Sequence, residues 1–372
     1  MNTTLNFEVR RDHLPTWRWL ESPTPQAAQL GEGEVLLEVE KFAFTSNNVT
    51  YAAYGDRLSY WNFFPAQDGW GRIPVWGYVR VLHSRHPEIT SGERFYGYVP
   101  MASHLVVSAG RAGPRGFIDQ APHRQPMPAV YNRYSRVTAQ FDTGADTGAD
   151  TGAGAEALEM ILRPLFLTSF LLAEFLQREQ LFGARRIVFS SASSKTAYGS
   201  AFLLAGATQA EIVGLTSPRN LQFVRDLGCY ARALSYDQLE SLPADEATLY
   251  VDFAGGRALL SRVHHHFTRL VHSCTAGGTQ WDALDDGAPL PGPKPKLFFA
   301  ALDMALGDSA GGASLQRRMS ESWLRFCARV LDADKPWMRI SSRQGRDAVE
   351  EVYAQMLQGG AAADTGQVLA LR

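Results

Sequence analysis

The second half of this chain alternates between strand-like and helix-like segments. Three short apolar runs, RIVFS at 186–190, EIVGL at 211–215 and YVDF at 250–253, have the composition of buried strands, and a helical pattern follows each. Two more strands are expected at 269–272 and 297–301. Strands joined by helices in this order form βαβ units around a parallel sheet. The sequence therefore predicts a doubly wound α/β fold for this region.

The N-terminal part of the chain has a β-rich pattern instead. Its strand candidates are short, are separated by turn residues, and lie at Glu34–Val39, Pro74–Leu82, Arg94–Val99 and His104–Val107. Strands of this length and spacing indicate a small β-barrel. The repeat DTGADTGADTG at 142–152 is rich in turn residues and is predicted to be a surface loop. Helices at 315–331 and 346–357 and a strand at 367–371 are expected to complete the chain.

Charge, hydropathy and cysteine usage exclude several classes of protein. A net charge of −2 gives no basic excess for a nucleic-acid partner. The longest apolar stretch, Leu165–Leu176, is interrupted by Glu174 and is too short to span a membrane, and the N-terminus lacks the apolar segment of a signal peptide. The three cysteines lie far apart without a CxxC pair, as in proteins of a reducing compartment. We therefore expect a cytoplasmic protein with no nucleic-acid or membrane partner.

Four segments carry a resemblance to a known superfamily, and they lie at Gly33–Asp56, Arg185–Ala205, Glu211–Cys229 and Gly345–Arg372. In order and spacing they resemble the medium-chain dehydrogenase/reductase superfamily. The resemblance implies an α/β protein with a GroES-like β-barrel catalytic domain at 1–157 and 308–372 and an inserted Rossmann domain at 158–307. A homodimer is compatible with it. More narrowly, SSASSKTA and the aromatic run around Tyr51–Phe64 resemble a branch known only as a domain of unknown function.

The loop after the first Rossmann strand is poor in glycine. Rossmann loops normally use glycine so that the backbone approaches a diphosphate at a helix N-terminus. Here the loop supplies hydroxyl groups and a positive charge instead, from Ser193, Ser194, Lys195 and Thr196. These side chains are candidates for binding phosphate. The alternative is an ordinary helix N-cap with a solvated lysine.

The residues after the second Rossmann strand favour NADP(H) over NAD(H). NAD-specific domains place an acidic residue there to bind the ribose diol. This chain has no acid at that place, and Ser217 and Arg219 are candidates for binding a 2′-phosphate. Alternatively, Ser217 only caps the next helix. Further on, Ser273 and Thr275 follow another strand and are candidates for contacts near the nicotinamide, although a plain turn explains them equally well.

No zinc site is expected. Zinc-dependent relatives need a cysteine and a histidine near the substrate, but the corresponding loop, Phe44–Asn48, contains neither, and the segment Pro74–Gly77 lacks the zinc-binding histidine. The run His264–His266 lies late on a predicted helix, where adjacent side chains point in different directions. We expect that run to be a solvated helix end.

The resemblance implies zinc-free hydride transfer from NADPH to an enone, a quinone or a related activated carbonyl compound. Candidate catalytic residues are Asn48, at the place of a polar residue beside the substrate, and Tyr51 and Tyr54, which can donate a proton or a hydrogen bond. Candidates for the wall of an apolar substrate pocket are Trp61, Phe64 and Trp76, with Phe63 and Trp70. The alternative for these aromatic residues is ordinary core packing.

A protein of another class is also compatible with the sequence. The glycine-poor loop would suit a chain that kept the fold and lost hydride chemistry, such as a lyase, a hydrolase or a nucleotide-responsive binding protein. His104 is given no functional role.

Overall fold

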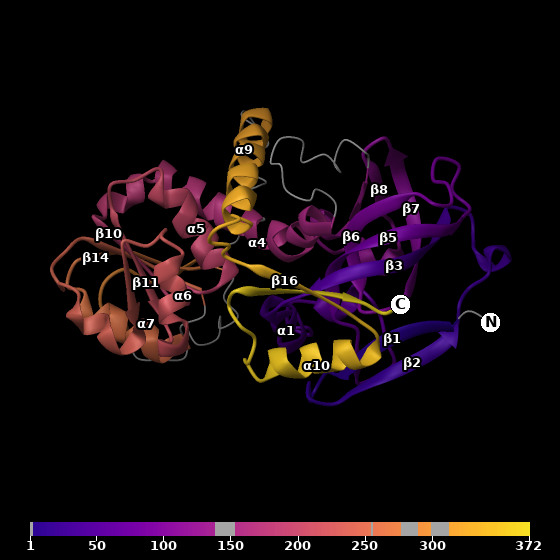
Figure 1. Cartoon of the computed structure of the whole chain (residues 1–372), viewed down its shortest axis with the longest axis horizontal. Coiled ribbons are helices and arrows are strands. Elements are labelled where there is room, and N and C mark those ends of the chain that lie inside the picture. The colour runs from indigo at the N-terminus through magenta and orange to yellow at the C-terminus, as the bar shows by residue number, and fades with distance from the viewer. Residues whose placement is uncertain (1–2, 138–152, 254–255, 277–288, 299–311) are drawn as a thin grey trace. The chain divides into compact units, whose positions relative to one another are not determined.

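The computed structural model describes residues 3–137, 153–253, 256–276, 289–298 and 312–372 (Figure 1). The chain forms two compact units. Unit 1 comprises Met1–Ile161 and Arg339–Arg372, and unit 2 comprises Leu162–Met338. The predicted loop at 142–152 lies outside the described residues.

Unit 2 contains a six-stranded sheet. Its strands are β10 (Arg186–Phe189), β11 (Glu211–Thr216), β12 (Arg232–Ser235), β13 (Thr248–Asp252), β14 (Leu270–Ala276) and β15 (Lys296–Phe298). All neighbouring pairs are parallel, and the spatial order is β12-β11-β10-β13-β14-β15. Numbered along the chain, this is the order 3-2-1-4-5-6 of a Rossmann sheet, so the predicted doubly wound fold is confirmed.

Three helices connect strands of this sheet, namely α5 (Lys195–Ala205), α6 (Leu221–Asp226) and α7 (Gly256–His266). The helix α4 (Ala153–Arg178) precedes β10, and α9 (Gly312–Val330) follows β15. Val188, Tyr250, Leu260 and Val263 share one buried apolar cluster, through which α7 packs on the sheet. Every β10 residue is buried, and the strand is therefore continuously apolar after Arg186 rather than alternating between apolar and polar residues.

The helix α9 extends unit 2 beyond the boundary predicted from the sequence. Residue 308 is the predicted return to the barrel domain, whereas the compact unit continues to Met338. The reason is aromatic packing, since the ring of Phe326 in α9 lies 4.9 Å from Phe166 and 6.1 Å from Tyr198 in unit 2.

Unit 1 contains a closed barrel. Its strands are β3 (Glu34–Phe44), β5 (Pro74–Ser84), β6 (Arg94–Pro100), β9 (Arg133–Arg136), β8 (Gly116–Asp119) and β7 (His104–Gly113), in spatial order. The ring closes because β3 also pairs with β7. The last strand of the chain, β17 (Thr365–Ala370), extends the sheet beyond β3, and β16 (Arg339–Gln344) pairs with β17. The predicted barrel is therefore confirmed.

The remaining elements of unit 1 cover the barrel. A small sheet is formed by β1 (Thr3–Arg10), β2 (Trp17–Pro23) and β4 (Trp70–Gly71), and the helices are α1 (Ser46–Ala53), α2 (Ala129–Asn132) and α10 (Arg346–Leu357). Tyr353 of α10 joins these parts, because its ring lies 5.1 Å from Phe7 and 5.7 Å from Trp17. The barrel core thus includes residues from both ends of the chain.

Candidate functional site

The strand order of unit 2 reverses between β10 and β13. Ligands of open parallel sheets bind beyond the carboxyl ends of the strands at such a switch point. The loop that follows β10 lies there and leads directly into α5, which begins at Lys195. The position predicted for phosphate binding is therefore the one that the topology favours.

Ser191 takes the place of a glycine in the backbone of this loop. Its φ is +46°, in the left-handed region that side chains rarely adopt. The Ser191 N–H donates to the Tyr236 hydroxyl at 3.1 Å, which holds this conformation. The next residue, Ala192, lies so near Gly214 of β11 that a Cβ at Gly214 would be 2.7 Å from the Ala192 Cβ. The glycine that permits close packing is thus on the neighbouring strand.

The loop is tied to the segment after β11 through Ser193. The Asn220 amide donates to Ser193 Oγ at 3.0 Å, and Thr216 Oγ1 lies 3.4 Å from the same atom. Ser194 caps α5 and accepts from the Ala197 N–H. Within the described residues, the N–H groups of Ser193 and Thr196 have no hydrogen-bond partner. The start of α5 therefore offers two N–H donors to an anionic group.

The two residues predicted to bind a 2′-phosphate lie beside this loop. Ser217 precedes the short 3₁₀ helix at Pro218–Asn220 and makes no capping hydrogen bond with its side chain. Arg219 belongs to that helix and is exposed. Because Asn220 bonds to Ser193, the structure brings the two predicted cofactor segments together.

Asp252 lies at the carboxyl end of β13, next to the same loop. Ser190 Oγ donates to the Asp252 carboxylate at 2.6 Å, and the same hydroxyl accepts from the Phe253 N–H. The Tyr250 hydroxyl lies 3.3 Å from the carboxylate. Burial and this neighbouring negative charge raise the pKa of Tyr250. Asp252 thus joins the ends of β10 and β13.

Ser273 is less accessible than a cofactor contact requires. It is 1% exposed, and its hydroxyl lies 2.9 Å from His264 Nε2. The expectation that His264–His266 forms a solvated helix end is wrong for His264, which is 2% exposed and also bonds to the Pro291 carbonyl. Only His265 of the run is exposed. Thr275 is half-buried in β14.

In unit 1, Asn48 fastens α1 to the barrel. Its side-chain oxygen accepts from the Thr45 N–H at 2.8 Å, and its amide donates to the Pro74 carbonyl at 3.0 Å. The first contact belongs to a capping box at the start of α1. Both polar atoms of Asn48 are therefore used inside the protein, and the residue sets the position of α1.

Tyr51 enters a cluster of aromatic side chains that the sequence does not reveal as a set. The buried or half-buried members are Tyr51, Tyr60, Phe63, Phe64, Trp76, Tyr98 and Tyr131. The Tyr51 ring stacks on Tyr60 with centroids 4.2 Å apart, and the Tyr60 ring meets Tyr131 edge-on with centroids 6.3 Å apart. Burial raises the pKa of Tyr51 and Tyr60 well above the usual value, so both phenols keep their protons at neutral pH.

Two polar atoms in this cluster lack partners. The hydroxyl of Tyr98 and the indole N–H of Trp76 are buried and make no hydrogen bond within the described residues. The rings of these two residues lie 5.0 Å apart, and Tyr131 lies 4.8 Å from Tyr98. Unsatisfied buried donors are uncommon in native proteins and often indicate a functional site.

The other predicted residues of this region lie outside the cluster. Trp61 is 1% exposed and belongs to the barrel core. Tyr54 is half-buried at the C-cap of α1, and Trp70 stacks under Arg18. Of the predicted substrate-side residues, the structure therefore groups Tyr51, Phe63, Phe64 and Trp76.

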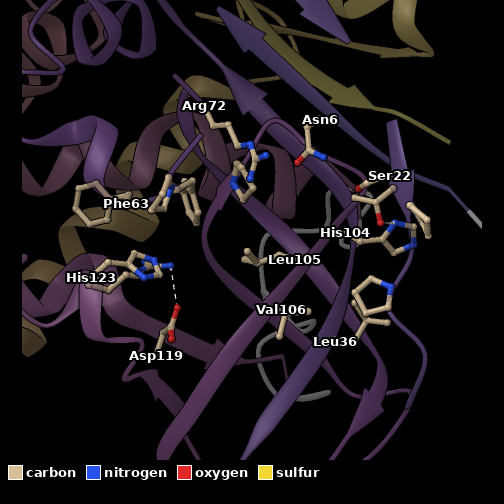
Figure 2. A pocket seen from close by; sticks show the side chains of 17 residues that line it. Asn6, Ser22, Leu36, Phe63, Arg72, His104, Leu105, Val106, Asp119 and His123 are labelled. Carbon is tan, nitrogen blue, oxygen red and sulfur yellow. Dashed lines mark hydrogen bonds and ion pairs between the residues drawn. The ribbon is translucent and has the colours of Figure 1, made fainter. Parts of the chain in front are cut away.

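Unit 1 also contains a pocket that the sequence does not indicate. His104 lines it together with Asn6, Arg72 and Leu105 (Figure 2). Burial lowers the pKa of His104 to about 4, so the imidazole is neutral at pH 7.

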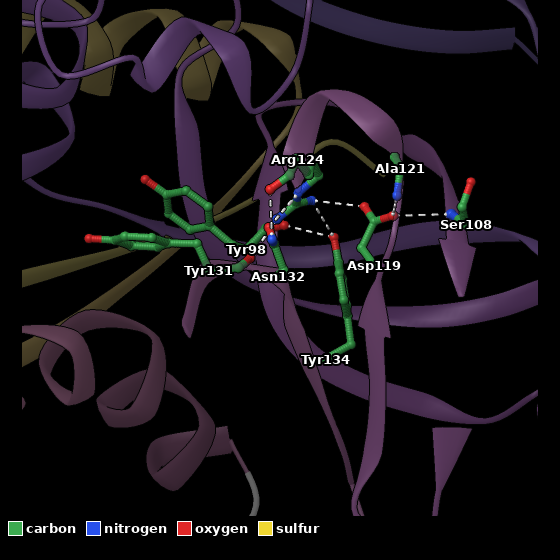
Figure 3. Close-up of polar contacts among 8 residues, drawn as sticks. All are labelled: Tyr98, Ser108, Asp119, Ala121, Arg124, Tyr131, Asn132 and Tyr134. Carbon is green, nitrogen blue, oxygen red and sulfur yellow. Dashed lines mark hydrogen bonds and ion pairs between the residues drawn. The ribbon is translucent and has the colours of Figure 1, made fainter. Parts of the chain in front are cut away.

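A buried arginine positions the tyrosines of the aromatic cluster (Figure 3). Arg124 is 1% exposed and donates to Asp119 at 3.2 Å, to Asn132 at 3.1 Å and to the Tyr131 carbonyl. It also lies 3.3 Å from the Tyr134 hydroxyl, which donates to the Tyr98 carbonyl. The network joins the segment after β8 to β6, so it fixes Tyr98 and Tyr131 side by side. No local sequence pattern marks Arg124 for this role.

Within the described part of the chain, no group of three or more His, Cys, Asp or Glu side chains is arranged to hold a metal ion. None of the helices described has both the length and the apolar character needed to cross a bilayer.

Solved structures share this fold over nearly their whole length. CurA in complex with NADPH, from Vibrio vulnificus, is 14% identical, with a TM-score of 0.57 and coverage of 96% of this chain and 94% of that chain. The quinone oxidoreductase from Coxiella burnetii is 12% identical, with a TM-score of 0.53 and full coverage of both chains at 100%. A mutant form of enoyl thioester reductase from Candida tropicalis is 10% identical, with a TM-score of 0.58 and the same 100% coverage. These likenesses confirm the predicted fold.

The sequence itself matches a family whose activity is not described. No curated protein matches the chain. The family model described as "Protein of unknown function (DUF2855)" matches residues 42–362. That span includes most of the barrel, the whole Rossmann sheet and α10. The chain therefore belongs to the family of proteins of unknown function DUF2855.

Proposed function

We propose that this protein is an oxidoreductase that uses NADPH to reduce an enone, a quinone or a related activated carbonyl compound without zinc. The observation that carries the proposal is the start of α5 at the switch point of the parallel sheet, where the N–H groups of Ser193 and Thr196 have no partner within the described residues. The fold likeness to CurA, solved with NADPH, supports the same cofactor.

The residues at this place fit a dinucleotide phosphate. Ser193, Ser194, Lys195 and Thr196 would hold the diphosphate, with Ser194 acting through the cap that it places on α5. Ser217 and Arg219 would hold the 2′-phosphate, and Thr275 would border the nicotinamide. NADPH, when bound, supplies a hydride.

Tyr51 is the residue that we propose for the substrate side. Its buried phenol keeps its proton, so it can donate a hydrogen bond to a substrate carbonyl and stabilise the negative charge that develops there. Phe64 and Trp76 would form the apolar wall around the reacting group, and Asn48 would act through the position of α1. A zinc-free reaction is consistent with the loop at Thr45–Asn48, which offers neither cysteine nor histidine.

One observation favours a second candidate, a protein that kept the fold without hydride chemistry. Three loop hydroxyls already have partners inside unit 2, because Ser190 bonds to Asp252, Ser193 to Asn220, and Ser194 caps α5. A loop so fully engaged would bind a nucleotide more weakly than a glycine-rich one. A nucleotide-responsive binding protein, a lyase or a hydrolase would fit that description.

The test is a fluorescence titration of the purified protein with NADPH and with NADH, beside the Arg219→Ala variant. We expect NADPH to bind at least about tenfold more tightly than NADH, because a guanidinium forms charge-assisted hydrogen bonds with a 2′-phosphate. Arg219→Ala should weaken NADPH binding by about tenfold or more and leave NADH binding unchanged. The matched control is Arg225→Ala, another exposed arginine, on α6, whose loss should change neither affinity.

The outcomes separate the two candidates. Tight NADPH binding with consumption of NADPH in the presence of enones or quinones supports the reductase. Absence of binding by both nucleotides overturns the cofactor assignment and leaves the non-redox candidate. Binding of NADPH without turnover of any such substrate favours the nucleotide-responsive protein. The predicted homodimer is checked on the same sample by sedimentation.

A further inference from the structure

The pocket lined by His104 lies entirely within unit 1, and its polar residues have no part in the proposed reaction. It has a volume of about 320 Å³ and lies between the small N-terminal sheet and strand β7 (Figure 2). Of the site residues predicted from the sequence, Phe63 and Phe64 contribute to its lining. A cavity of this size is within the range that accommodates a small organic ligand.

One end of this pocket is polar and contains a hydrogen-bonding atom without a partner. His104 is 4% exposed, its Nδ1 lies 2.9 Å from Ser103 Oγ, and its Nε2 has no partner within the described residues. The Ser103 oxygen accepts the Leu5 N–H, and Thr4 Oγ1 lies 3.3 Å from Nδ1 of His104. Nε2 is therefore the ring nitrogen whose hydrogen-bonding capacity is unused within the described residues.

The pocket also carries a surplus of positive charge, at Arg72. Glu8 is completely buried and accepts hydrogen bonds from both Arg18 and Arg72, at 2.7 Å and 3.0 Å. One carboxylate therefore faces two guanidinium groups, and Arg72 is the one that lines the pocket. At the other end, Arg124 is balanced by Asp119. The net positive charge at Arg72 suits a ligand with a single negative charge.

The rest of the pocket is apolar. Leu105 and Val106 of β7 form its floor together with Leu36 of β3, and Phe63 lies toward the far end (Figure 2). Four prolines, Pro23, Pro25, Pro65 and Pro100, complete the apolar lining. Such a lining favours a hydrocarbon group over a polar one.

We propose that this pocket is a separate ligand site that binds a small amphipathic carboxylate. The carboxylate lies beside Arg72 and Asn6, and the hydrocarbon part lies along Leu105 and Val106. The site is contained in unit 1 and does not depend on nucleotide binding.

The experiment is calorimetric titration of the full-length protein with three probes of equal chain length, namely octanoate, 1-octanol and octylamine. We expect octanoate to bind with one site per chain, at least about tenfold more tightly than octylamine, because the positive charge of Arg72 attracts the first probe and repels the second. Equal binding of all three probes, or no octanoate binding, would overturn the proposal.

Two variants locate the binding. Val106→Trp fills the apolar floor and should abolish octanoate binding, whereas the control Val130→Trp, at an exposed position of α2, should leave it unchanged. Arg72→Gln leaves Glu8 paired with Arg18 and should remove the preference for octanoate over octanol. If Val106→Trp does not fold, the head-group preference of Arg72→Gln decides. Unchanged octanoate binding in a folded Val106→Trp protein places the ligand elsewhere and refutes the site.

Discussion

At the scale of single residues, the side chains of Ser191 and His104 occupy environments that are unusual for their residue types. Ser191 adopts a left-handed φ of +46° where a glycine would be unstrained, and it is held there by the Tyr236 hydroxyl. His104 is a buried neutral imidazole among hydroxyl groups. Both arrangements lower the stability of the folded protein locally. Both residues lie at candidate ligand sites, where such local strain is commonly found.

The burial of His104 makes the stability of unit 1 depend on pH. Its pKa is about 4 in the folded protein and about 6.5 in an unfolded chain, so only the unfolded chain takes up the proton between these values. The stability contribution is complete above about pH 6.5 and is lost as the pH falls toward 4, by roughly 1.4 kcal/mol per pH unit. His104→Gln should reduce this slope, measured by urea unfolding at pH 7 and pH 5.

The control for that measurement is His83→Gln, at an exposed position of β5. It should unfold with the pH dependence of the parent protein. The free energy of unfolding will still depend on pH in every variant, because burial also lowers the pKa of His264 and His272. A His104→Gln protein with an unchanged slope would show that His104 is protonated in the folded state.

At the scale of elements, the segment between α1 and β5 depends on a tryptophan held between two glycines. A Cβ on Gly55 would lie 2.1 Å from Trp61, and a Cβ on Gly71 would lie 2.4 Å from the same ring. The indole therefore fills a slot that only glycine leaves open on both sides. This packing holds the segment that carries Tyr60, Phe63 and Phe64 into the aromatic cluster.

Gly71→Ala should destabilise the protein by about 1–3 kcal/mol, because the added methyl group cannot be accommodated without moving the indole. Thermal unfolding measures the change. Gly113→Ala is the matched control, since a Cβ there meets nothing within 4 Å, and its effect should be small. In the double variant Gly71→Ala with Trp61→Leu, the alanine should cost less than it does alone. Equal costs in both backgrounds would mean that the ring is not the obstacle.

Strands and helices are easiest to predict from the sequence where all residues of an element are buried in the same way. The strands β10, β11 and β13 were foreseeable because a strand covered on both faces is continuously apolar. The strand β1 was not, because it contains the charged residue Glu8, whose burial requires Arg18 and Arg72 from other parts of the chain. The strand β12, with the sequence RALS, was not predicted either, because it is short and has polar residues at both ends.

The same limit applies to the candidate sites. The hydroxyl-rich loop is visible because its residues are consecutive and follow a strand. The aromatic cluster is only partly predictable from the sequence. Tyr98 contacts Tyr51 from a distant strand of the barrel, and Tyr131 is held in place by the buried Arg124. The pocket of His104 is invisible in sequence, since its lining comes from many separate segments. His264 is buried by contact with β14, which a helical pattern alone does not indicate.

At the scale of the whole molecule, each unit has its own sheet and its own core. The sheet of unit 2 is assembled from consecutive strands, whereas the barrel of unit 1 needs both ends of the chain. The strand β17 pairs with β3 through residues 367–369, and α10 contributes Val349 and Tyr353 to the barrel core. The units should therefore differ in their ability to fold as fragments.

The fragment Ala153–Met338 should fold alone, with cooperative thermal unfolding followed by circular dichroism, because it retains every strand of the parallel sheet. The fragment 1–161 should not, because it lacks the strand and the helix that complete the barrel. Adding 339–372 through a flexible linker should restore its folding. A cooperative transition in the fragment 1–161 alone would contradict this account.

The meeting of both chain ends in one unit, where the Arg372 guanidinium donates to the Thr3 carbonyl, has a consequence for the order of events during translation. The ribosome releases all strands of unit 2 before it releases β16 and β17. The part of the barrel that is synthesised first then remains incomplete, with the edge of β3 that pairs with β17 uncovered, while the central unit folds. A nascent chain in that interval is open to chaperones and proteases, and a premature stop near the end would leave the barrel permanently incomplete.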